Sequence, residues 1–166
     1  MASGCHVANE VIKLAYEEAR VALKEQDATL ANVRNRAAGL LAAASVVTSL
    51  AAAVGLLNIA PDRGPTIPTW AAWALVGLTV LIGAGVMAVL WPSQAWDFGP
   101  SPDIILANAE GDDIDAVRRT ATKAMLLASE SNNRKLAWRV RAYQATVLVL
   151  LLEVVLLMSA LLLVRR

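Results

Sequence analysis

Residues 69–90 read TWAAWALVGLTVLIGAGVMAVL, and no charged side chain interrupts them. A helix of this length is long enough to cross the hydrocarbon core of a membrane, which is about 30 Å thick. A helix in a soluble protein needs a polar face, whereas this run is apolar all round. It therefore predicts a membrane-spanning helix, inside a longer stretch without charges from Gly64 to Trp96.

Two further runs have the same character. One extends from Ala37 to Ala60, and the other from Ala142 to Val164, where Glu153 is the only charged residue. The 166 residues are 57% apolar and 17% charged, with a mean hydropathy of +0.53, whereas a soluble domain is about 45–50% apolar and about 25% charged. We therefore predict an all-α integral membrane bundle with three membrane-spanning helices and long cytoplasmic helical extensions.

The link between the first two runs predicts a helical hairpin. Residues 61–68 read PDRGPTIP, which is short and rich in helix breakers. Trp70 and Trp73 at one end of the second run, with Trp91 and Trp96 at the other, are typical of an aromatic belt at both membrane interfaces.

The positions of lysine and arginine predict the orientation, because cytoplasmic loops carry an excess of both. The hairpin loop offers only Arg63, so the N-terminal segment and the long connection are expected in the cytoplasm. The C-terminus then falls outside, although Arg165 and Arg166 oppose the rule. The cytoplasmic cations are Arg34, Arg36, Arg118, Arg119, Lys123, Arg134, Lys135, Arg139 and Arg141.

The chain is predicted to have four parts. No glycine or proline lies between Cys5 and Arg36, which favours one long helix that extends the first span. In the connection, Ser101-Pro102-Asp103 and the acidic segment 111–115 each have the chemistry of a helix start. The predicted parts are an N-terminal cytoplasmic helix (1–36), a membrane hairpin (37–96), a cytoplasmic helical connection (97–141) that can run on into the third span, and a C-terminal membrane helix (142–166).

Apolar stripes at helical spacing run along both cytoplasmic parts. Two interpretations are open: the stripes pack on each other or on neighbouring subunits of a homo-oligomer, or the helices are solvated beside the membrane. The stripes comprise Val7, Val11, Leu14 and Val21, then Leu23, Leu30, Val33, Ala37 and Leu40, and, in the connection, Ile114, Val117, Ala121, Ala124 and Ala128.

Glu153 is the first candidate functional residue. An ionised carboxylate that faces lipid near the centre of a span costs on the order of 3 kcal/mol or more. Such a residue faces a bundle interior or a water-filled cavity, or is protonated. It either lines a pore or locks the bundle by a hydrogen bond to a neighbouring helix, and both roles require helix–helix contact.

Other polar and small side chains in the runs predict close helix packing. Interhelical hydrogen bonds in membranes contribute about 0.6–2 kcal/mol each, and small residues let backbones approach. The polar candidates besides Glu153 are Ser45, Thr48, Ser49 and Asn58, with Thr79 on the second helix; the packing candidates are Ala51, Gly55, Gly77, Ala84 and Ala88, and Gly83 and Gly85 would also allow close approach.

The sequence offers no recognisable catalytic or metal site. One cysteine excludes an internal disulfide, and the single His6 excludes paired-histidine chemistry. Asp112, Asp113 and Asp115 are explained better as a helix start than as cation ligands. No phosphate-binding loop, dinucleotide fingerprint or nucleophile elbow occurs, and no basic patch with interleaved aromatics suggests nucleic acid. We expect neither enzyme activity nor a cofactor.

The layout resembles a known class of proteins. Residues 31–38, ANVRNRAA, lead from a charged helix into the hairpin, which exits at residues 89–92, VLWP; residues 132–135, NNRK, introduce Arg139, Arg141 and the last apolar helix. From Asp27 to the C-terminus this resembles the small membrane effectors of bacterial antiphage systems, namely the transmembrane effector of Pycsar, the cyclic-pyrimidine-nucleotide defence system, and the SLATT membrane domain. SLATT modules typically have two membrane helices, so a third span favours the Pycsar-like comparison.

The resemblance implies a dormant membrane protein that oligomerises on a signal, permeabilises the bacterial inner membrane and halts infection. It implies a cyclic nucleotide as the signal, sensed in the cytoplasmic helices. The cationic candidates for that role are Arg118, Arg119, Arg134 and Lys135, whose alternative role is to set the topology.

The leading hypothesis is therefore a membrane effector of antiviral defence, of bacterial or prophage origin. One alternative is a non-conducting membrane anchor or scaffold for a cytoplasmic protein. The other is a phage holin-like protein, which shares the small size and the hairpin.

Overall fold

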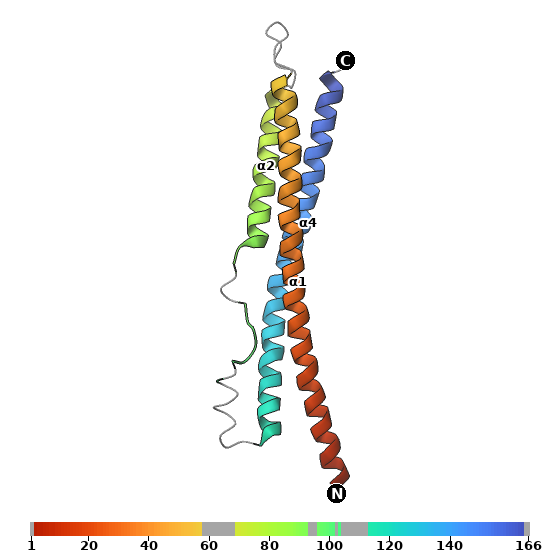
Figure 1. Ribbon diagram of the computed structural model, residues 1–166, viewed down its shortest axis with the longest axis vertical. Helices are drawn as coiled ribbons and strands as arrows, with labels where there is room; N and C mark the ends of the chain where they lie inside the picture. The colour runs from red at the N-terminus through yellow and green to blue at the C-terminus, as the bar shows by residue number, and fades with distance from the viewer. Residues whose placement is uncertain (1, 58–68, 93–95, 102, 104–112, 165–166) are drawn as a thin grey trace. The chain divides into compact units, whose positions relative to one another are not determined.

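The computed structural model describes residues 2–57, 69–92, 96–101, 103 and 113–164, and these form three long helices (Figure 1). They are α1 (Ala2–Leu57), α2 (Thr69–Leu90) and α4 (Ile114–Val164). The described part of the chain contains no strand. Each of the three helices is long and apolar enough to cross a membrane.

The two long helices begin and continue as the sequence predicts. α1 is one helix of 56 residues, and α4 is one helix of 51 residues that includes both the connection and the third apolar run. The backbone oxygen of Asp113 accepts hydrogen bonds from the amides of Ala116 (2.9 Å) and Val117 (3.2 Å), which makes Asp113 the N-cap of α4. Asp115 adds a negative charge in the first turn, where the helix dipole favours it. The predicted start within residues 111–115 is confirmed.

The chain divides into two compact units. Unit 1 comprises Met1–Ala31 and Pro92–Trp138, and unit 2 comprises Asn32–Trp91 and Arg139–Arg166. Both α1 and α4 contribute residues to each unit, whereas α2 belongs to unit 2 alone.

Unit 1 is built on the packing of α1 against α4. Ala19 and Leu23 of α1 pack with Ala121 and Met125 of α4 in a small buried cluster. One turn further along α1, Gln26 Nε2 donates a hydrogen bond to Ser129 Oγ at 2.8 Å. Because these contacts advance together along both helices, α1 and α4 run parallel in this unit. The small alanines allow the two backbones to approach closely.

The face of α1 that unit 1 buries is different from the first predicted stripe. Val11, Leu14 and Val21 are 59%, 58% and 45% exposed, so they do not pack within the chain, which leaves packing against another subunit and solvation as the open interpretations. The seam instead follows Ala19, Leu23 and Leu30 at spacings of four and seven, positions typical of a coiled coil. In α4, Ala121 of the predicted stripe is buried, whereas Ile114 at its start is 62% exposed; the buried Met125 is not part of that stripe.

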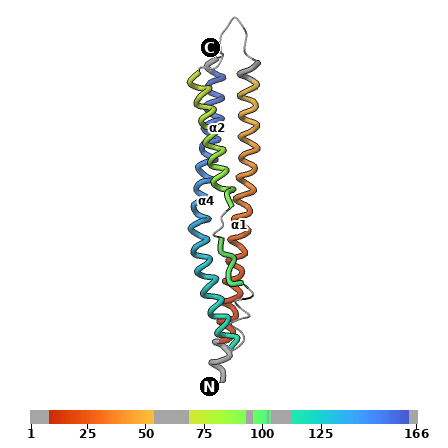
Figure 2. Tube along the Cα trace, turned by 90° about the vertical axis from the view of Figure 1, so that its left-hand side faces the viewer, coloured from red at the N-terminus to blue at the C-terminus, as the bar shows by residue number. Residues whose placement is uncertain are grey.

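Unit 2 contains three packed segments. Figures 1 and 2 show α2 antiparallel to the segments of α1 and α4 beside it. Ala44 of α1 packs with Ile82 and Val86 of α2, and Leu40, Leu90, Val149 and Leu150 cover this cluster. Large apolar side chains on the outer faces of all three segments are exposed, including Val46, Leu50, Val76, Val80, Leu81, Leu148, Leu151 and Leu152. Such surfaces are typical of helices that face lipid.

α2 and α4 approach each other closely at Gly85. A Cβ atom at this position would collide with Thr146 Oγ1 and lie 3.3 Å from Thr146 Cβ and Cγ2. Thr146 is buried, and its β-branched side chain is stiff, so it cannot turn aside easily. At Gly83, two residues earlier, an added Cβ would meet no atom of a neighbouring helix within 4 Å, so this glycine supports no such contact.

The Gly85→Ala substitution should therefore destabilise unit 2 by about 1–3 kcal/mol, the usual cost of overpacking. The measurement is loss of helical circular dichroism as a denaturing detergent is titrated into protein held in a mild one. Gly83→Ala is the matched control and should unfold at the wild-type midpoint. Equal midpoints for the two variants would contradict the close approach.

Candidate functional site

Glu153 lies buried between helices, with only 1% of its surface exposed. Its Oε1 accepts a hydrogen bond from Thr79 Oγ1 of α2 at 2.8 Å. Its Oε2 is also buried and has no hydrogen-bond partner among the described residues. One oxygen of the carboxyl group thus accepts a hydrogen bond, and the other is buried without a partner among the described residues.

Thr79 connects Glu153 to α1. The Thr79 hydroxyl also lies 3.0 Å from the backbone oxygen of Leu75 and 3.4 Å from Thr48 Oγ1. A hydroxyl has one proton and two lone pairs, so it can donate to only one of these neighbours at a time. The result is a row of polar atoms that joins α1, α2 and α4 through Thr48, Thr79 and Glu153.

No basic side chain neutralises this row within the described residues 37–57, 69–90 and 142–164, where Glu153 is the only ionisable acid or base apart from Tyr143. Burying an ionised carboxylate without a partner is costly. Such a group has two uses: it can hold helices together by hydrogen bonds, or it can take a proton or cation at its open oxygen.

An open groove of about 460 Å³ lies over the same polar row, between α1 and α2. Thr48 and Thr79 line it together with Ser45 and Ser49. The two serines donate to their own helix, to the oxygens of Leu41 (2.8 Å) and Ser45 (2.7 Å), and both remain exposed. Asn58, the remaining polar candidate, lies outside the described residues.

The predicted small-residue contacts are distributed differently. A Cβ added at Gly77 would have no neighbour within 4 Å, and Ala84 is exposed, so neither makes a helix contact within the chain. Ala51 and Ala88 are half-buried, and Gly55 lies in the last turn of α1, where its surroundings are not described. A role in packing against another chain stays a prediction for Gly77 and Ala84.

The four cationic candidates do not form one site. Arg118 and Arg134 lie about 24 Å apart along α4, at 1.5 Å per residue. Arg118 pairs with Asp115 at 3.5 Å, and Arg134 pairs with Glu130 at 3.1 Å. Lys135 pairs with Asp97 at 3.5 Å, and Arg119 is exposed. Arg134 and Lys135 line an open groove of about 360 Å³ with Leu127, Glu130 and Ser131.

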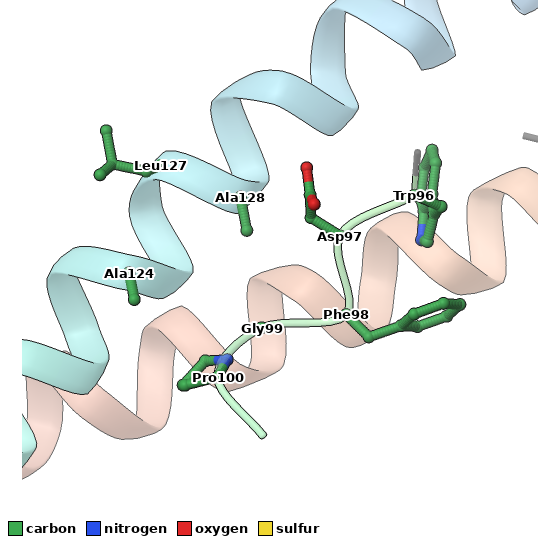
Figure 3. A pocket seen from close by; sticks show the side chains of 8 residues that line it. All are labelled: Trp96, Asp97, Phe98, Gly99, Pro100, Ala124, Leu127 and Ala128. Carbon is green, nitrogen blue, oxygen red and sulfur yellow. The ribbon is translucent and has the colours of Figure 1, made fainter. Parts of the chain in front are cut away.

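The segment Trp96–Pro100, which follows α2 in the chain, is bound to both helices of unit 1 (Figure 3). Trp96 Nε1 donates to Asp27 Oδ1 at 2.6 Å. Asn132 clamps Asp97 twice: its Nδ2 donates to the Asp97 oxygen (2.8 Å), and its Oδ1 accepts from the Asp97 amide (3.2 Å). Trp96 is buried, so its predicted place in an aromatic belt is wrong, whereas Trp70, Trp73 and Trp91 are exposed.

The segment turns at Gly99, whose φ of +92° favours glycine. A Cβ there would lie 3.3 Å from Leu23 Cδ1. Phe98 is 79% exposed beside the turn. An open groove of about 610 Å³ is lined by this segment and by Ala124, Leu127 and Ala128 of α4 (Figure 3).

The buried polar side chains of α4 share one spacing that sequence reasoning missed. Among the described residues they are Asn132, Arg139, Thr146 and Glu153, each seven residues after the last. We call this row the polar ladder. Asn132 contacts Asp97, Arg139 contacts Trp91, Thr146 contacts Gly85, and Glu153 contacts Thr79. The residue numbers fall on one side as they rise on the other because α2 runs antiparallel to α4. A search for polar instead of apolar residues at heptad spacing would have found it.

Arg139 is the ladder member at the C-terminal end of α2. It is 5% exposed, and its Nη2 donates to the backbone oxygen of Trp91 at 2.9 Å. This contact satisfies a carbonyl just past the end of α2, where the helix dipole favours a cation. Burial lowers the pKa of Arg139 from its ordinary value, and the positive charge of Arg34 lowers that pKa further.

Comparisons with known protein families, with curated proteins and with solved structures found no match to this chain. Within the part of the chain that the structure describes, no group of three or more histidine, cysteine, aspartate or glutamate side chains is placed to hold a metal ion.

Substituting Asn132 by alanine should release the Trp96–Pro100 segment. The change removes both hydrogen bonds to Asp97 and leaves a backbone amide and carbonyl without them, at a cost of about 1–3 kcal/mol. Chymotrypsin should then cleave after Phe98 several times faster than in the wild type, as followed by mass spectrometry of the fragments. Asn133→Ala is the matched control, because Asn133 is exposed and accepts only from Gln26 Nε2 (2.9 Å). If both variants are cleaved at the wild-type rate, Asn132 does not hold the segment.

Proposed function

We propose that this chain is a multi-pass inner-membrane effector of bacterial or prophage antiviral defence, which assembles from several copies and permeabilises the membrane on a signal. In this proposal α1, α2 and α4 all cross the bilayer. The N-terminus and the connection lie in the cytoplasm, and the C-terminus lies outside.

The observation that carries the proposal is the polar row Thr48–Thr79–Glu153 in helices otherwise apolar enough for lipid. A buried carboxyl group with an unsatisfied oxygen is expensive in such a place and usually marks a path or a relay. The exposed hydroxyls of Ser45 and Ser49 extend the polar surface into the groove between α1 and α2. Copies that gather around this groove would face its hydroxyls toward a shared, hydrated axis, with Glu153 behind Thr79 at one hydrogen bond from the groove.

The nature of the signal rests on the resemblance to nucleotide-signalling effectors. A cyclic nucleotide is the proposed trigger, sensed by the cytoplasmic parts of α1 and α4. Arg118 lies about 24 Å from Arg134 along α4 and pairs with Asp115, which favours a role in topology for Arg118. The groove lined by Arg134 and Lys135 is then the cationic surface proposed for sensing.

Induced expression should collapse the membrane potential of a bacterial host, followed with a potential-sensitive dye, and Glu153→Leu should slow the collapse several-fold because it removes the polar wall. Glu153→Gln keeps a hydrogen-bond acceptor for Thr79 without a negative charge, so it separates a charge requirement from a packing requirement. Ser159→Ala is the matched control on the same helix, since Ser159 is exposed and donates only to its own backbone, at Val155 (2.7 Å).

Protein levels of all variants must match by immunoblot for the comparison to hold. The effector proposal loses if high expression leaves potential and growth unchanged both in uninfected cells and during phage infection.

A second function, a non-conducting anchor for a cytoplasmic protein, is favoured by one observation. Val11, Leu14 and Val21 form an exposed apolar stripe on α1 at heptad-like spacing. The stripe differs from the buried seam of unit 1, which packs against α4. An unpartnered stripe of this kind suits the groove or helix of another protein.

For the anchor, replacing Val11, Leu14 and Val21 by glutamine should abolish capture of a cytoplasmic partner in a pull-down from native membranes. The buried Ala19 and Leu23 are kept, so unit 1 should remain folded. Glutamine at the exposed Arg20, Lys24 and Glu25 is the control. Depolarisation that is lost with the stripe, without any captured protein, would argue for association between copies instead.

A further inference from the structure

Two buried arginine donors without partners lie in unit 2. Nη1 of Arg139 and Nε of Arg34 are both shielded from solvent, and neither has a hydrogen-bond partner among the described residues. Arg139 is 95% buried and is engaged on its other side only, through Nη2 and the Trp91 oxygen. Buried donors are nearly always satisfied, so two orphans on neighbouring arginines require an explanation.

The two guanidinium groups act on each other electrostatically. Val149 packs against the cluster that contains Ala44. Arg34 and Arg139 each lie ten residues earlier on α1 and α4, which run in the same direction, so the two cations lie at the same level. In agreement with this register, the charge of Arg34 lowers the pKa of Arg139. Packing like charges away from water is unfavourable unless an anion joins them. The C-terminal end of α2 supplies only about half a negative charge.

No acidic side chain in the described part of unit 2 can supply the missing charge. Glu153 is its only acid, and it lies about 21 Å further along α4 at 1.5 Å per residue. The two other cations in the described part of the unit are occupied or exposed: Arg36 Nε donates to Asn32 Oδ1 at 3.1 Å, and Arg141 is exposed. Among the described residues neither Arg34 nor Arg139 has an acidic partner, which leaves their donors available to an anion from outside the chain.

The position and the chemistry of the donors select the anion. Guanidinium groups bind phosphate oxygens through paired N–H donors with a geometry that carboxylates and phosphates share. Arg139 lies at the end of α2, three residues before the third apolar run, which is the level of lipid headgroups in the proposed membrane placement. Basic pockets between helices at this level bind anionic headgroups. The anionic lipids of bacterial membranes commonly carry a phosphodiester group in the headgroup. A cyclic nucleotide carries the same phosphodiester monoanion.

We infer that Arg34 and Arg139 form a binding site for a phosphodiester monoanion, at the junction of α1, α4 and the C-terminal end of α2. Nη1 of Arg139 and Nε of Arg34 donate to its oxygens, while Nη2 of Arg139 keeps its bond to Trp91. The site is independent of pore formation, although its level in the bilayer rests on the proposed membrane placement.

Native mass spectrometry of the full chain released from detergent tests this site. The lipid arm offers phosphatidylglycerol against phosphatidylcholine, and the soluble arm offers 3′,5′-cyclic uridine monophosphate. Arg34→Gln and Arg139→Gln are compared with Arg141→Gln, which removes the same charge from an exposed position two residues away. The expected result is a loss of bound anion of at least about tenfold in the first two variants and not in the third.

A lipid occupant is supported if phosphatidylglycerol stays bound to the wild type and to Arg141→Gln and is lost from Arg34→Gln and Arg139→Gln. A soluble occupant is supported if the cyclic nucleotide shows this pattern. Binding that falls equally in all three variants, or no binding of either probe by the wild type, overturns the site. Arg34→Gln removes no hydrogen bond seen in the described residues, so it decides the matter if Arg139→Gln loses its helical circular dichroism. If the chain binds the anion but leaves the membrane potential intact, this site is supported and the effector proposal is contradicted.

Discussion

The polar ladder of α4 is the set of contacts on which the placement of α2 depends. Apolar helices that pack through alanine and valine can slide or turn against one another at little cost, because neighbouring registers bury similar surface. A polar side chain in the seam removes that freedom, since only one register gives it a partner. Glu153 meets Thr79, Thr146 meets the bare backbone at Gly85, and Arg139 meets the carbonyl at Trp91. Three different chemistries therefore specify one antiparallel alignment.

The same row gives each level of α4 a different task. Asn132 holds the backbone of Asp97 by two neutral hydrogen bonds. These bonds replace the helical hydrogen bonds that the amide and carbonyl groups of Asp97 lack outside a helix. Arg139 brings a guanidinium group to a helix end, and Glu153 places a carboxyl group between apolar helices. These two ionisable members of the ladder are also the ones with an atom that has no hydrogen-bond partner among the described residues. Residues that set the register of α2 are thus also the residues with an unsatisfied polar atom.

Much of this architecture is predictable from the sequence, and the failures have physical causes. Length and composition are enough to predict three helices long and apolar enough to cross a membrane, the continuity of α1 and the start of α4 near Asp113, because these depend on local chemistry alone. The buried face of α1 is predictable only in part. Leu23, Leu30 and Ala37 of the second predicted stripe are buried. Val11 and Leu14 of the first stripe are exposed, whereas the smaller Ala19 is buried, because close packing prefers the smaller side chain. In the sequence, Trp96 resembles a tryptophan at a membrane interface. Its actual partner, the Asp27 carboxylate, lies 69 residues away in the chain, so sequence spacing does not indicate their hydrogen bond. Gly85 and Gly77 look alike in sequence, and only the opposing Thr146 distinguishes them.

Heptad spacing in a single continuous helix also restricts how this chain can change in length. One residue inserted into α4 between Asn132 and Glu153 turns everything beyond it by about 100°, which moves a buried carboxyl or guanidinium group to the apolar outer surface. Seven residues inserted together nearly restore the phase but displace the later members by about two turns from their partners on α2. Related chains that conserve this arrangement should therefore vary in length at the helix ends and in the loops, while the 21-residue interval from Asn132 to Glu153 stays constant.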